Sequence, residues 1–484
     1  MAVVTHERPR TGRAAELGLL VIALLIAVGA YAQVALAIDG ELPADLATRA
    51  GGLAVLAVVI HLLVRWKAPY ADPVILPVVV ALNGLGLAMI YRIGLATGES
   101  GAADRQLMWT LVGAAAAVAT LWVIRDHRVL RRYTYTAMVA GLVLLVLPLL
   151  PLIGTTINGA RIWIHLGPLS FQPGEIAKIV LAVFFAGYLV TKRDTLTLAG
   201  PRILWLQFPR IRDLGPILLA WGTSIVILVG QRDLGTSLLF FGLFVAMLYV
   251  ATERLSWILL GLVLFAAGAV AASQLFGHVG ARFDGWLNAY DPEVYNRSPG
   301  GSGQLVSGQF GMASGGLMGT GLGQGYPETV PYASSDFIIA ALGEELGLVG
   351  LLVILLLYLI VAERGMRAGI GVRDGFGKLF ASGMAFVFAF QVFVVVGGIT
   401  RIIPVTGLTA PFLAAGGSSL VSNWIIIALL LRISDSARRP APPLEPITDD
   451  GGRRPDDGAD GPGDPGRRGG PGPGDDSRTE VVRL

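Results

Sequence analysis

Long apolar stretches alternate with short polar connections along most of this 484-residue chain. Each stretch holds about 17 to 25 residues, and about 20 apolar residues in a helix are enough to cross a hydrocarbon core of ~30 Å. Twelve stretches qualify, near residues 14–37, 46–64, 73–93, 106–124, 133–151, 174–191, 214–230, 234–251, 257–276, 336–362, 376–399 and 407–431. The pattern predicts an all-α polytopic membrane protein with about twelve transmembrane helices.

The composition agrees with this prediction. Hydrophobic residues make up 54% of the chain and charged residues 15%, whereas soluble domains carry about 25% charged residues. Mean hydropathy is +0.66. The chain has no cysteine, which excludes disulfides, thiolate metal sites and thiol nucleophiles. The first apolar stretch lacks a convincing cleavage site and a second stretch follows at once, so we expect an uncleaved membrane anchor.

The basic residues predict how the chain crosses the membrane. Lys and Arg concentrate in every second connection, and short connections of this kind face the cytoplasm. The basic connections lie at Arg8–Arg13, Arg65–Lys67, Arg125–Arg132, Lys192–Arg212 and Arg364–Arg373. We therefore expect both termini in the cytoplasm and the long connection at 277–335 on the outer side.

The last part of the chain, residues 434–484, has a different composition. It consists largely of Pro, Gly, Asp and Arg, with almost no apolar residues. Such a segment cannot bury enough apolar surface to fold. We predict a disordered cytoplasmic tail, and a partner-docking arm is the functional alternative.

Ionisable residues inside apolar stretches are candidates for a functional site, because a charge there costs roughly 2.5–3.5 kcal/mol unless it meets a partner or water. Glu175 and Lys178 lie three residues apart after Pro173, on one face of the sixth stretch. The spacing favours an internal ion pair, whose role is either functional or purely structural. Asp233, between the seventh and eighth stretches, either caps the next helix or belongs to a site.

Charged residues also lie at the start of the tenth stretch and after the eleventh. Asp336 sits where a helix N-cap belongs, while Glu344 and Glu345 lie about two turns deeper and need an internal partner. Arg401, at the expected outer edge of the membrane, is suited to holding an anionic lipid head group. The glycines at 416–417 are explained by close helix packing.

The connection at 277–335 is too long to be a plain connector, which favours a functional role. Trp286 and Tyr290 are aromatics of the kind that prefer membrane interfaces, and Asp291-Pro292 follows them. Glycine-rich segments, which let a backbone approach a ligand, lie at 300–303 and 315–325. On these features alone, Asp291-Pro292 is also compatible with an ordinary turn.

Taken together, these segments resemble the shape, elongation, division and sporulation family, whose members include RodA, FtsW and SpoVE. The matching motifs occur in the family's order and span about residues 72 to 432. They are NGARIWIHLGP at 158–168, QPGEIAK at 172–178, DLGTS at 233–237, SGGLMGTGLG at 314–323, SDF at 335–337, EELGL at 344–348, IPVTGL at 403–408 and GGSS at 416–419.

The resemblance implies a domain organisation. A ten-helix glycosyltransferase core would occupy residues 72–433 and include the large outer loop at 277–335. A cytoplasmic segment and two extra transmembrane helices would precede it at 1–71, and the tail would follow at 434–484. Within the family, the chain looks closer to the elongation type than to the division type.

The chain departs from the family pattern at several positions. Gly174 replaces a serine, and Arg161 lies one place before the arginine that normally precedes the tryptophan. The spacer before Asp291-Pro292 is one residue shorter, and Ser302-Gly303-Gln304 replaces a Gly-Tyr-Gln element. Asp291 is still the carboxylate of this loop with matching neighbours. The alternatives are Asp284 and Glu293.

The activity implied by the resemblance is glycosyl transfer between two lipid II molecules. A sugar hydroxyl of one attacks the anomeric carbon of the other, and undecaprenyl pyrophosphate leaves with inversion. The resemblance makes Asp291 the general base. The implied substrate-binding residues are Arg401 and Lys178 at the pyrophosphate, Arg161 and Arg282 behind them, Glu175 holding Lys178, and Asp233 and Gln304 shaping the site.

The resemblance also implies a setting. It places the chain in the bacterial plasma membrane, with a class B penicillin-binding protein (a transpeptidase) and other elongation or division proteins as partners and with no nucleic acid. No cofactor is required, although Mg²⁺ or Mn²⁺ bridging a carboxylate and the pyrophosphate is compatible with the residues. Two rival functions stay open: a transporter that flips lipid II, and a scaffold that only recruits a transpeptidase.

Overall fold

The computed structural model describes residues 11–99, 101–151, 153–157, 160–167, 169–197, 202–203, 206–207, 211–298 and 300–440. These ranges contain 11 helices that are long and apolar enough to cross a membrane and one shorter apolar helix at Leu218–Gly230. Together they correspond to the predicted stretches and confirm a helical multi-pass membrane protein. Most of the predicted tail lies outside the described residues.

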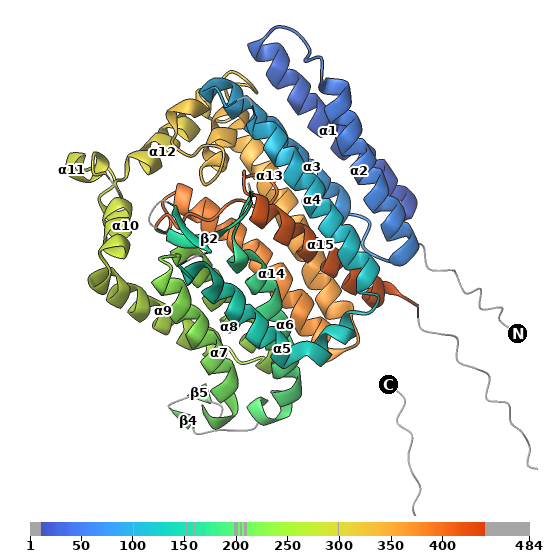
Figure 1. Ribbon diagram of the computed structural model, residues 1–484, viewed down its shortest axis with the longest axis vertical. Coiled ribbons are helices and arrows are strands. Elements are labelled where there is room, and N and C mark those ends of the chain that lie inside the picture. The colour runs from blue at the N-terminus through green and yellow to red at the C-terminus, as the bar shows by residue number, and fades with distance from the viewer. Residues whose placement is uncertain are drawn as a thin grey trace, which may run out of the picture. The chain divides into compact units, whose positions relative to one another are not determined.

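The membrane-spanning helices follow the order of the apolar stretches (Figure 1). They are α1 (Arg13–Ile38), α2 (Leu46–Lys67), α3 (Ile75–Thr97), α4 (Ala102–Val123), α5 (Thr134–Val146, preceded by the 3₁₀ helix η1 at His127–Tyr133 and followed by η2 at Leu147–Leu149), α6 (Pro173–Thr197), α7 (Ile211–Gly230), α8 (Leu234–Thr252), α9 (Ser256–Leu275), α13 (Ile338–Gly371), α14 (Gly375–Ile399) and α15 (Gly417–Arg438).

Helices α3, α6, α14 and α15 form the centre of the bundle. Between 72% and 89% of their most apolar windows is buried, compared with 6% for α9. Small residues let these helices approach closely. A Cβ on Gly113 of α4 would lie 2.5 Å from the ring of Trp424 in α15, so α4 and α15 pack at this glycine. The exposed helix α9 contacts mainly α8 and the next helix in the chain.

The hairpin of α1 and α2 packs on α3 and α4, and a buried charged group fastens one end of it. Glu16 of α1 pairs with Arg13, and its other oxygen lies 2.7 Å from Nδ1 of His61 in α2. Arg13 also donates to the carbonyl of Ala71. All three side chains are buried, so the charges compensate one another instead of facing lipid.

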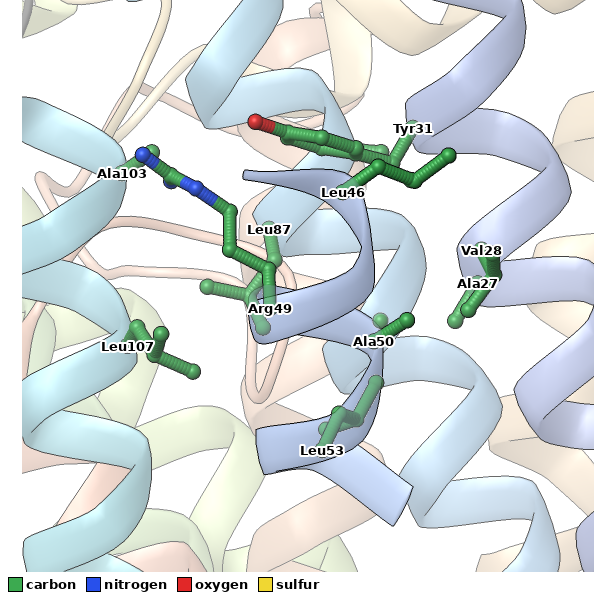
Figure 2. Close-up of a pocket in the computed structure, with 12 residues that line it drawn as sticks. Ala27, Val28, Tyr31, Leu46, Arg49, Ala50, Leu53, Leu87, Ala103 and Leu107 are labelled. Carbon is green, nitrogen blue, oxygen red and sulfur yellow. The ribbon is translucent and has the colours of Figure 1, made fainter. Parts of the chain in front are cut away.

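The other end of the hairpin is fastened by Arg49 of α2, shown in Figure 2. Its guanidinium pairs with Asp45 at 2.5 Å and with Asp104 of α4 at 2.8 Å. It also lies over the rings of Tyr31 and Tyr91, at 5.5 and 5.7 Å from their centroids. The small cavity of about 40 Å³ beside it is lined by all four helices.

Two predicted boundaries were wrong. The twelfth stretch was expected to be helical from 407, but α15 begins at Gly417. Gly407 has a φ of 81°, and Pro411 lacks the N–H that a helix interior needs, so the segment before α15 stays irregular. At its other end α15 continues beyond 434 to Arg438, because Asp435 is buried and accepts from the backbone N of Tyr70 at 2.8 Å.

The long connection at 277–335 is itself folded. It contains α10 (Gly277–Leu287), α11 (Pro292–Tyr295), α12 (Gly303–Gly315) and η3 (Pro327–Thr329), which lie at one edge of the bundle in Figure 1. Its glycine-rich turn packs on a kink in α13, where Gly347 has a φ of 68°. A Cβ there would lie 2.3 Å from the backbone N of Gly319, so only glycine fits.

The structure also contains short strands, and the hydropathy pattern did not predict them. An antiparallel sheet of β1 (Gly154–Ile157), β2 (Ala160–Leu166) and β3 (Leu169–Phe171) joins α5 to α6. Ile164 of β2 pairs with Gly154 of β1 and with Phe171 of β3. The pair β4 (Arg202–Ile203) and β5 (Leu206–Gln207) lies between α6 and α7.

Candidate active site

The predicted ion pair at the start of α6 is present. Glu175 and Lys178 lie 2.6 Å apart, and both side chains are almost completely buried. Gln391 of α14 accepts from Lys178 Nζ at 3.1 Å, and the Ser422 hydroxyl of α15 donates to Glu175 at 2.7 Å. Two neighbouring helices therefore satisfy the pair, which lets the charges remain inside the bundle.

Asp233 lies close to this pair and caps α8, as one of its two expected roles requires. Its carboxylate accepts from the backbone N of Thr236 at 2.9 Å and from Nε2 of Gln172 at 3.3 Å. Burial raises the pKa of the Asp233 carboxyl, the hydrogen bonds from Thr236 lower it, and the negative charge of Glu175 adds to the increase. The cap is therefore also part of a charged group.

Arg282 of α10 joins this group from outside the spans. Its guanidinium donates to the carbonyl of Val405 at 3.0 Å. Burial lowers the pKa of Arg282, whereas the carboxylates of Asp233 and Asp336 raise it. We call Glu175, Lys178, Asp233, Arg282 and Asp336 the charged cluster.

The expected role of Asp336 as the N-cap of the tenth span was wrong. Helix α13 begins at Ile338, and no side chain caps it. Burial raises the pKa of Asp336 to about 6, against the lowering effect of Arg282 and of a hydrogen bond with Ser335. A Cβ on Gly407 would lie 3.7 Å from Oδ2 of Asp336 and 4.0 Å from Nη2 of Arg282, so this glycine lies beside both groups.

Glu344 and Glu345 do have the internal partners that they were expected to need. Glu345 pairs with Arg92 of α3 at 2.9 Å and accepts from the backbone N of Gly323 at 2.8 Å. Glu344 accepts from the backbone N of Tyr326 at 2.9 Å. These carboxylates hold the glycine-rich turn against α13 and α3.

Asp291 lies in the turn between α10 and α11. We call α10, this turn and α11 the arm. It is the N-cap of α11, and its carboxylate accepts from the backbone N of Glu293 at 2.9 Å. Its side chain is exposed. The turn is thus formed by Asp291-Pro292 as expected, and a carboxylate that caps a short exposed turn is free to meet a ligand.

Arg401 contacts the same turn. Its guanidinium lies 5.1 Å from the ring centroid of Tyr290, the residue before Asp291, and it donates to the carbonyl of Leu287 at 3.3 Å. The indole N–H of Trp286 donates to the Arg401 carbonyl at 3.0 Å. The backbone of Arg401 has a φ of 62°, which non-glycine residues rarely adopt. These contacts place a cation beside the arm.

The two alternative carboxylates on this loop have different surroundings. Asp284 is ion-paired with Arg297 at 3.1 Å. In the described part of the chain, neither Asp291 nor Glu293 has an ion-pair partner. Asp291 differs from Glu293 in lying next to Tyr290, on which Arg401 stacks.

The side chains of two other candidate residues, Arg161 and Gln304, do not bond to the charged cluster in the described part of the chain. Arg161 of β2 donates to the carbonyl of Leu150 at 3.2 Å, and its backbone N donates to the carbonyl of Gln231 at 3.1 Å. Gln304 is the second residue of α12. Among the described residues, no hydrogen bond or ion pair links either side chain to the cluster or to Asp291.

The family model for the cell cycle proteins FtsW, RodA and SpoVE matches residues 73–439. The chain belongs to this family. The match begins shortly after α2, so the α1–α2 hairpin lies outside the matched range. The resemblance inferred from the motifs is confirmed.

Alignments with other FtsW/RodA/SpoVE proteins cover most of this chain. A relative from Mycobacterium tuberculosis, named peptidoglycan glycosyltransferase RodA, is 49% identical over 446 residues, which cover 90% of this chain and 93% of the relative. Stage V sporulation protein E of Bacillus subtilis is 32% identical over 384 residues, covering 77% and 99%. A chain in a solved peptidoglycan synthase complex aligns with a TM-score of 0.61 at 26% identity, covering 76% and 99%.

The structure of this FtsW/RodA/SpoVE protein adds site residues that sequence reasoning missed. Gln172, Gln391 and Ser422 hold the carboxylates and the ammonium of the charged cluster. Gln391 lies within an apolar span, where a polar side chain is costly, and this could have identified it. Gln172 opens the QPGEIAK motif but was given no role there, and a single serine such as Ser422 is too common in spans to stand out by type.

An apolar cavity of about 540 Å³ lies between α8, α9, α13 and α14. Phe241, Phe265, Phe386, Phe390 and Ile403 are among the residues that line it. Ile403 is two residues from Arg401. A single segment therefore joins the apolar cavity to the cation beside the arm.

Proposed function

We propose that this chain is a peptidoglycan glycosyltransferase that polymerises lipid II into glycan strands. Its family membership and its 49% identity to a relative named peptidoglycan glycosyltransferase RodA support this function. The observation that carries the proposal is the arm, where exposed Asp291 follows Tyr290 and Arg401 stacks on that tyrosine. A proton acceptor and a cation are thereby brought to one place.

In the proposed reaction, a sugar hydroxyl of one lipid II attacks the anomeric carbon of another. The new C–O bond forms as the bond to the pyrophosphate breaks, and undecaprenyl pyrophosphate leaves with the electron pair. Asp291 accepts the hydroxyl proton as the attack develops. Attack from the face opposite the leaving group inverts the anomeric centre, so a second carboxylate nucleophile is not needed.

Positive charge must stabilise the departing pyrophosphate. Arg401 is the first candidate, because its guanidinium lies beside the turn that carries Asp291. Arg282 lies on α10 and also belongs to the charged cluster, where it faces Asp233 and Asp336. Glu175 compensates the charge of Lys178. We therefore assign Lys178 a shared role with Glu175 in shaping the polar end of the site, with Asp233 beside them.

The apolar cavity between α8, α9 and α14 is the proposed place for a polyprenyl tail. It is lined almost entirely by apolar side chains, including Ile403, which is two residues from Arg401 in the sequence. A pyrophosphate at Arg401 would leave its prenyl chain at the border of this cavity. The wall formed by α9 is one exposed helix, which allows entry from the lipid side.

The setting remains part of the proposal. The structural neighbour from a complex that coordinates polymerisation and crosslinking supports a class B penicillin-binding protein as the partner. We place both termini in the cytoplasm and the arm outside, following the basic connections. The described residues contain no group of three or more His, Cys, Asp or Glu side chains that could hold Mg²⁺ or Mn²⁺. We therefore assign no step of the reaction to a metal ion.

The test is polymerisation of fluorescent lipid II by the purified protein, with and without a partner transpeptidase. Glycan strands should form, and Asp291→Asn should slow their formation by roughly 10²- to 10⁴-fold while lipid II remains bound. A flippase would move lipid II across a vesicle membrane and form no strands with any partner. A scaffold would only stimulate a transpeptidase, and its effect would survive Asp291→Asn.

A further inference from the structure

Two exposed tryptophans, one at the end of α2 and one at the end of α4, form an aromatic pair. Both lie far from the charged cluster in the sequence. Trp66 and Trp122 meet edge to face with ring centroids 5.2 Å apart, and 62% and 48% of their surfaces are exposed. Buried Arg432 of α15 donates to the carbonyls of Lys67 at 2.5 Å and Leu121 at 2.7 Å. One guanidinium therefore fixes both helix ends and the two indoles that they carry.

Lys67 lies between the two indoles. Its ammonium is 3.8 Å from the ring centroid of Trp66 and 4.4 Å from that of Trp122. In the described part of the chain it has no carboxylate within 4.0 Å. Arg65 and Arg125, near the same helix ends, also have no ion pair there. Among the described residues, Lys67, Arg65 and Arg125 are therefore three cations near these helix ends that have no acidic partner.

The two acidic side chains that interact electrostatically with Arg432, Asp126 and Asp435, are already engaged. Asp126 accepts from the backbone N of Arg128 at 2.9 Å and lies 3.7 Å from His127. Asp435, which contributes to the electrostatic surroundings of Arg432, pairs with Arg439 at 2.7 Å. Neither carboxylate supplies the counter-charge for Lys67.

We propose that Trp66, Lys67 and Trp122 bind the head group of an anionic phospholipid. Indoles prefer the head-group level of a bilayer, and basic side chains next to a transmembrane helix attract anionic lipids. The ammonium lies between the indoles and meets the lipid phosphate. Exposed apolar side chains one and two turns back along α2, such as Leu62 and Val59, contact the acyl chains.

The charge pattern that orients a membrane protein does not require this geometry. Orientation depends only on the number of Lys and Arg in a connection. It does not need an ammonium between two indoles, nor a buried arginine that holds the two helix ends together. The geometry instead forms a site of fixed shape for a phosphate with apolar chains attached.

The test uses the full chain in detergent with equal amounts of phosphatidylglycerol and phosphatidylcholine of identical acyl chains, and counts bound lipids by native mass spectrometry. The wild type should retain phosphatidylglycerol preferentially. Lys67→Ala should lower its occupancy about fivefold, as expected for one basic residue at a lipid surface. Lys67→Arg should restore most of the binding.

Arg105→Ala is the matched control, because Arg105 is exposed, pairs with Glu99 and lies near the opposite end of α4. It should leave lipid retention unchanged. Equal retention of both lipids by the wild type would overturn the proposal. An equal loss in Arg105→Ala and Lys67→Ala, at unchanged thermal stability, would also overturn it.

Discussion

The charged cluster and the arm both carry acidic and basic residues, but they are built in different ways. In the cluster, Glu175 and Lys178 are buried, and side chains of two neighbouring helices satisfy them. On the arm, Asp291 is exposed and is bonded only within its own turn in the described part of the chain. Buried charges depend on one another, whereas an exposed cap leaves the carboxylate available to a ligand.

This difference separates stability from activity. Loss of a charge from the cluster leaves its partner buried and unpaired, so the first effect should be on folding. Loss of the carboxylate on the arm disturbs only a four-residue helix at the surface, so the effect should be on the reaction rate. Variants of the two regions should therefore differ in whether stability or the reaction rate falls first.

The largest effect is expected for Asp291→Asn. The amide keeps the size of the side chain and can still cap α11, but it cannot accept a proton. Loss of a general base typically lowers a rate by roughly 10²- to 10⁴-fold. Glycan-strand formation by purified protein should fall by this factor, while lipid II binding and the melting temperature in detergent stay unchanged.

Asp284→Asn and Glu293→Gln are the matched controls on the same loop. Asp284 is paired with Arg297, so its loss removes a surface ion pair of small energetic value. Both variants should retain much of the activity. Full polymerisation by Asp291→Asn, or an equal loss in all three variants, would end the assignment of Asp291 as the base.

The next largest effect concerns the pair in α6. Lys178→Ala leaves Glu175 buried without its cation, and breaking a buried pair in this way costs roughly 3–5 kcal/mol. The double variant Glu175→Ala/Lys178→Ala removes both charges and should be more stable than Lys178→Ala alone. Thermal unfolding of the wild type, both single variants and the double variant gives the coupling. Additive losses would mean that the two residues are not coupled.

A smaller, pH-dependent effect is expected from Asp336. Burial raises its pKa to about 6 from an ordinary value of 3.8, so the folded protein binds this proton more tightly than the unfolded chain. Ionisation of Asp336 therefore destabilises the folded state. The destabilisation is absent at low pH, grows as pH rises between these two values, and is complete above about 6.

Asp336→Asn should accordingly be more stable relative to the wild type at pH 7 than at pH 4.5. The measurement is the difference in melting temperature between the two proteins across this range, with Asp284→Asn as an exposed control. A difference that does not change between pH 4.5 and pH 7 would show that the pKa of Asp336 is not raised in the folded protein.

The sequence predicted those parts of the molecule that depend on local pattern. Length and hydropathy identified the spans, and a spacing of three residues after Pro173 indicated the pair of Glu175 and Lys178. The role of Asp233 as a cap was also visible, because a capping residue acts on the backbone of its own helix.

The rest depends on contacts between distant segments. Asp233 lies between α7 and α8, whereas Arg282 and Asp336 lie far apart in the sequence at the two ends of the connection between α9 and α13, and no local pattern shows that the three meet. We expected Asp336 to be a cap because it lies just before an apolar stretch. In the structure its side chain lies near Arg282 and caps no helix. Hydropathy also extended the last span back to 407. It measures only how apolar the side chains are, so it does not detect the left-handed backbone of Gly407 or the missing N–H of Pro411.

The smallest effect is expected from removing the tail. A chain that ends after Arg439 keeps all of α15 and the ion pair of Arg439 with Asp435 at 2.7 Å. We place the tail in the cytoplasm and the arm outside from the basic connections, and a polar tail on one side cannot reach an active site on the other, so polymerisation by the purified truncated protein should equal that of the full chain. A chain that ends after Ile433 is the contrasting variant. It loses the Ser434 hydroxyl bound to the backbone N of Asp72 and the Asp435 carboxylate bound to that of Tyr70, and its melting temperature should fall. If the chain that ends after Arg439 inserts normally and yet forms no glycan strands, the tail takes part in the reaction and the expected separation of the two membrane sides is wrong.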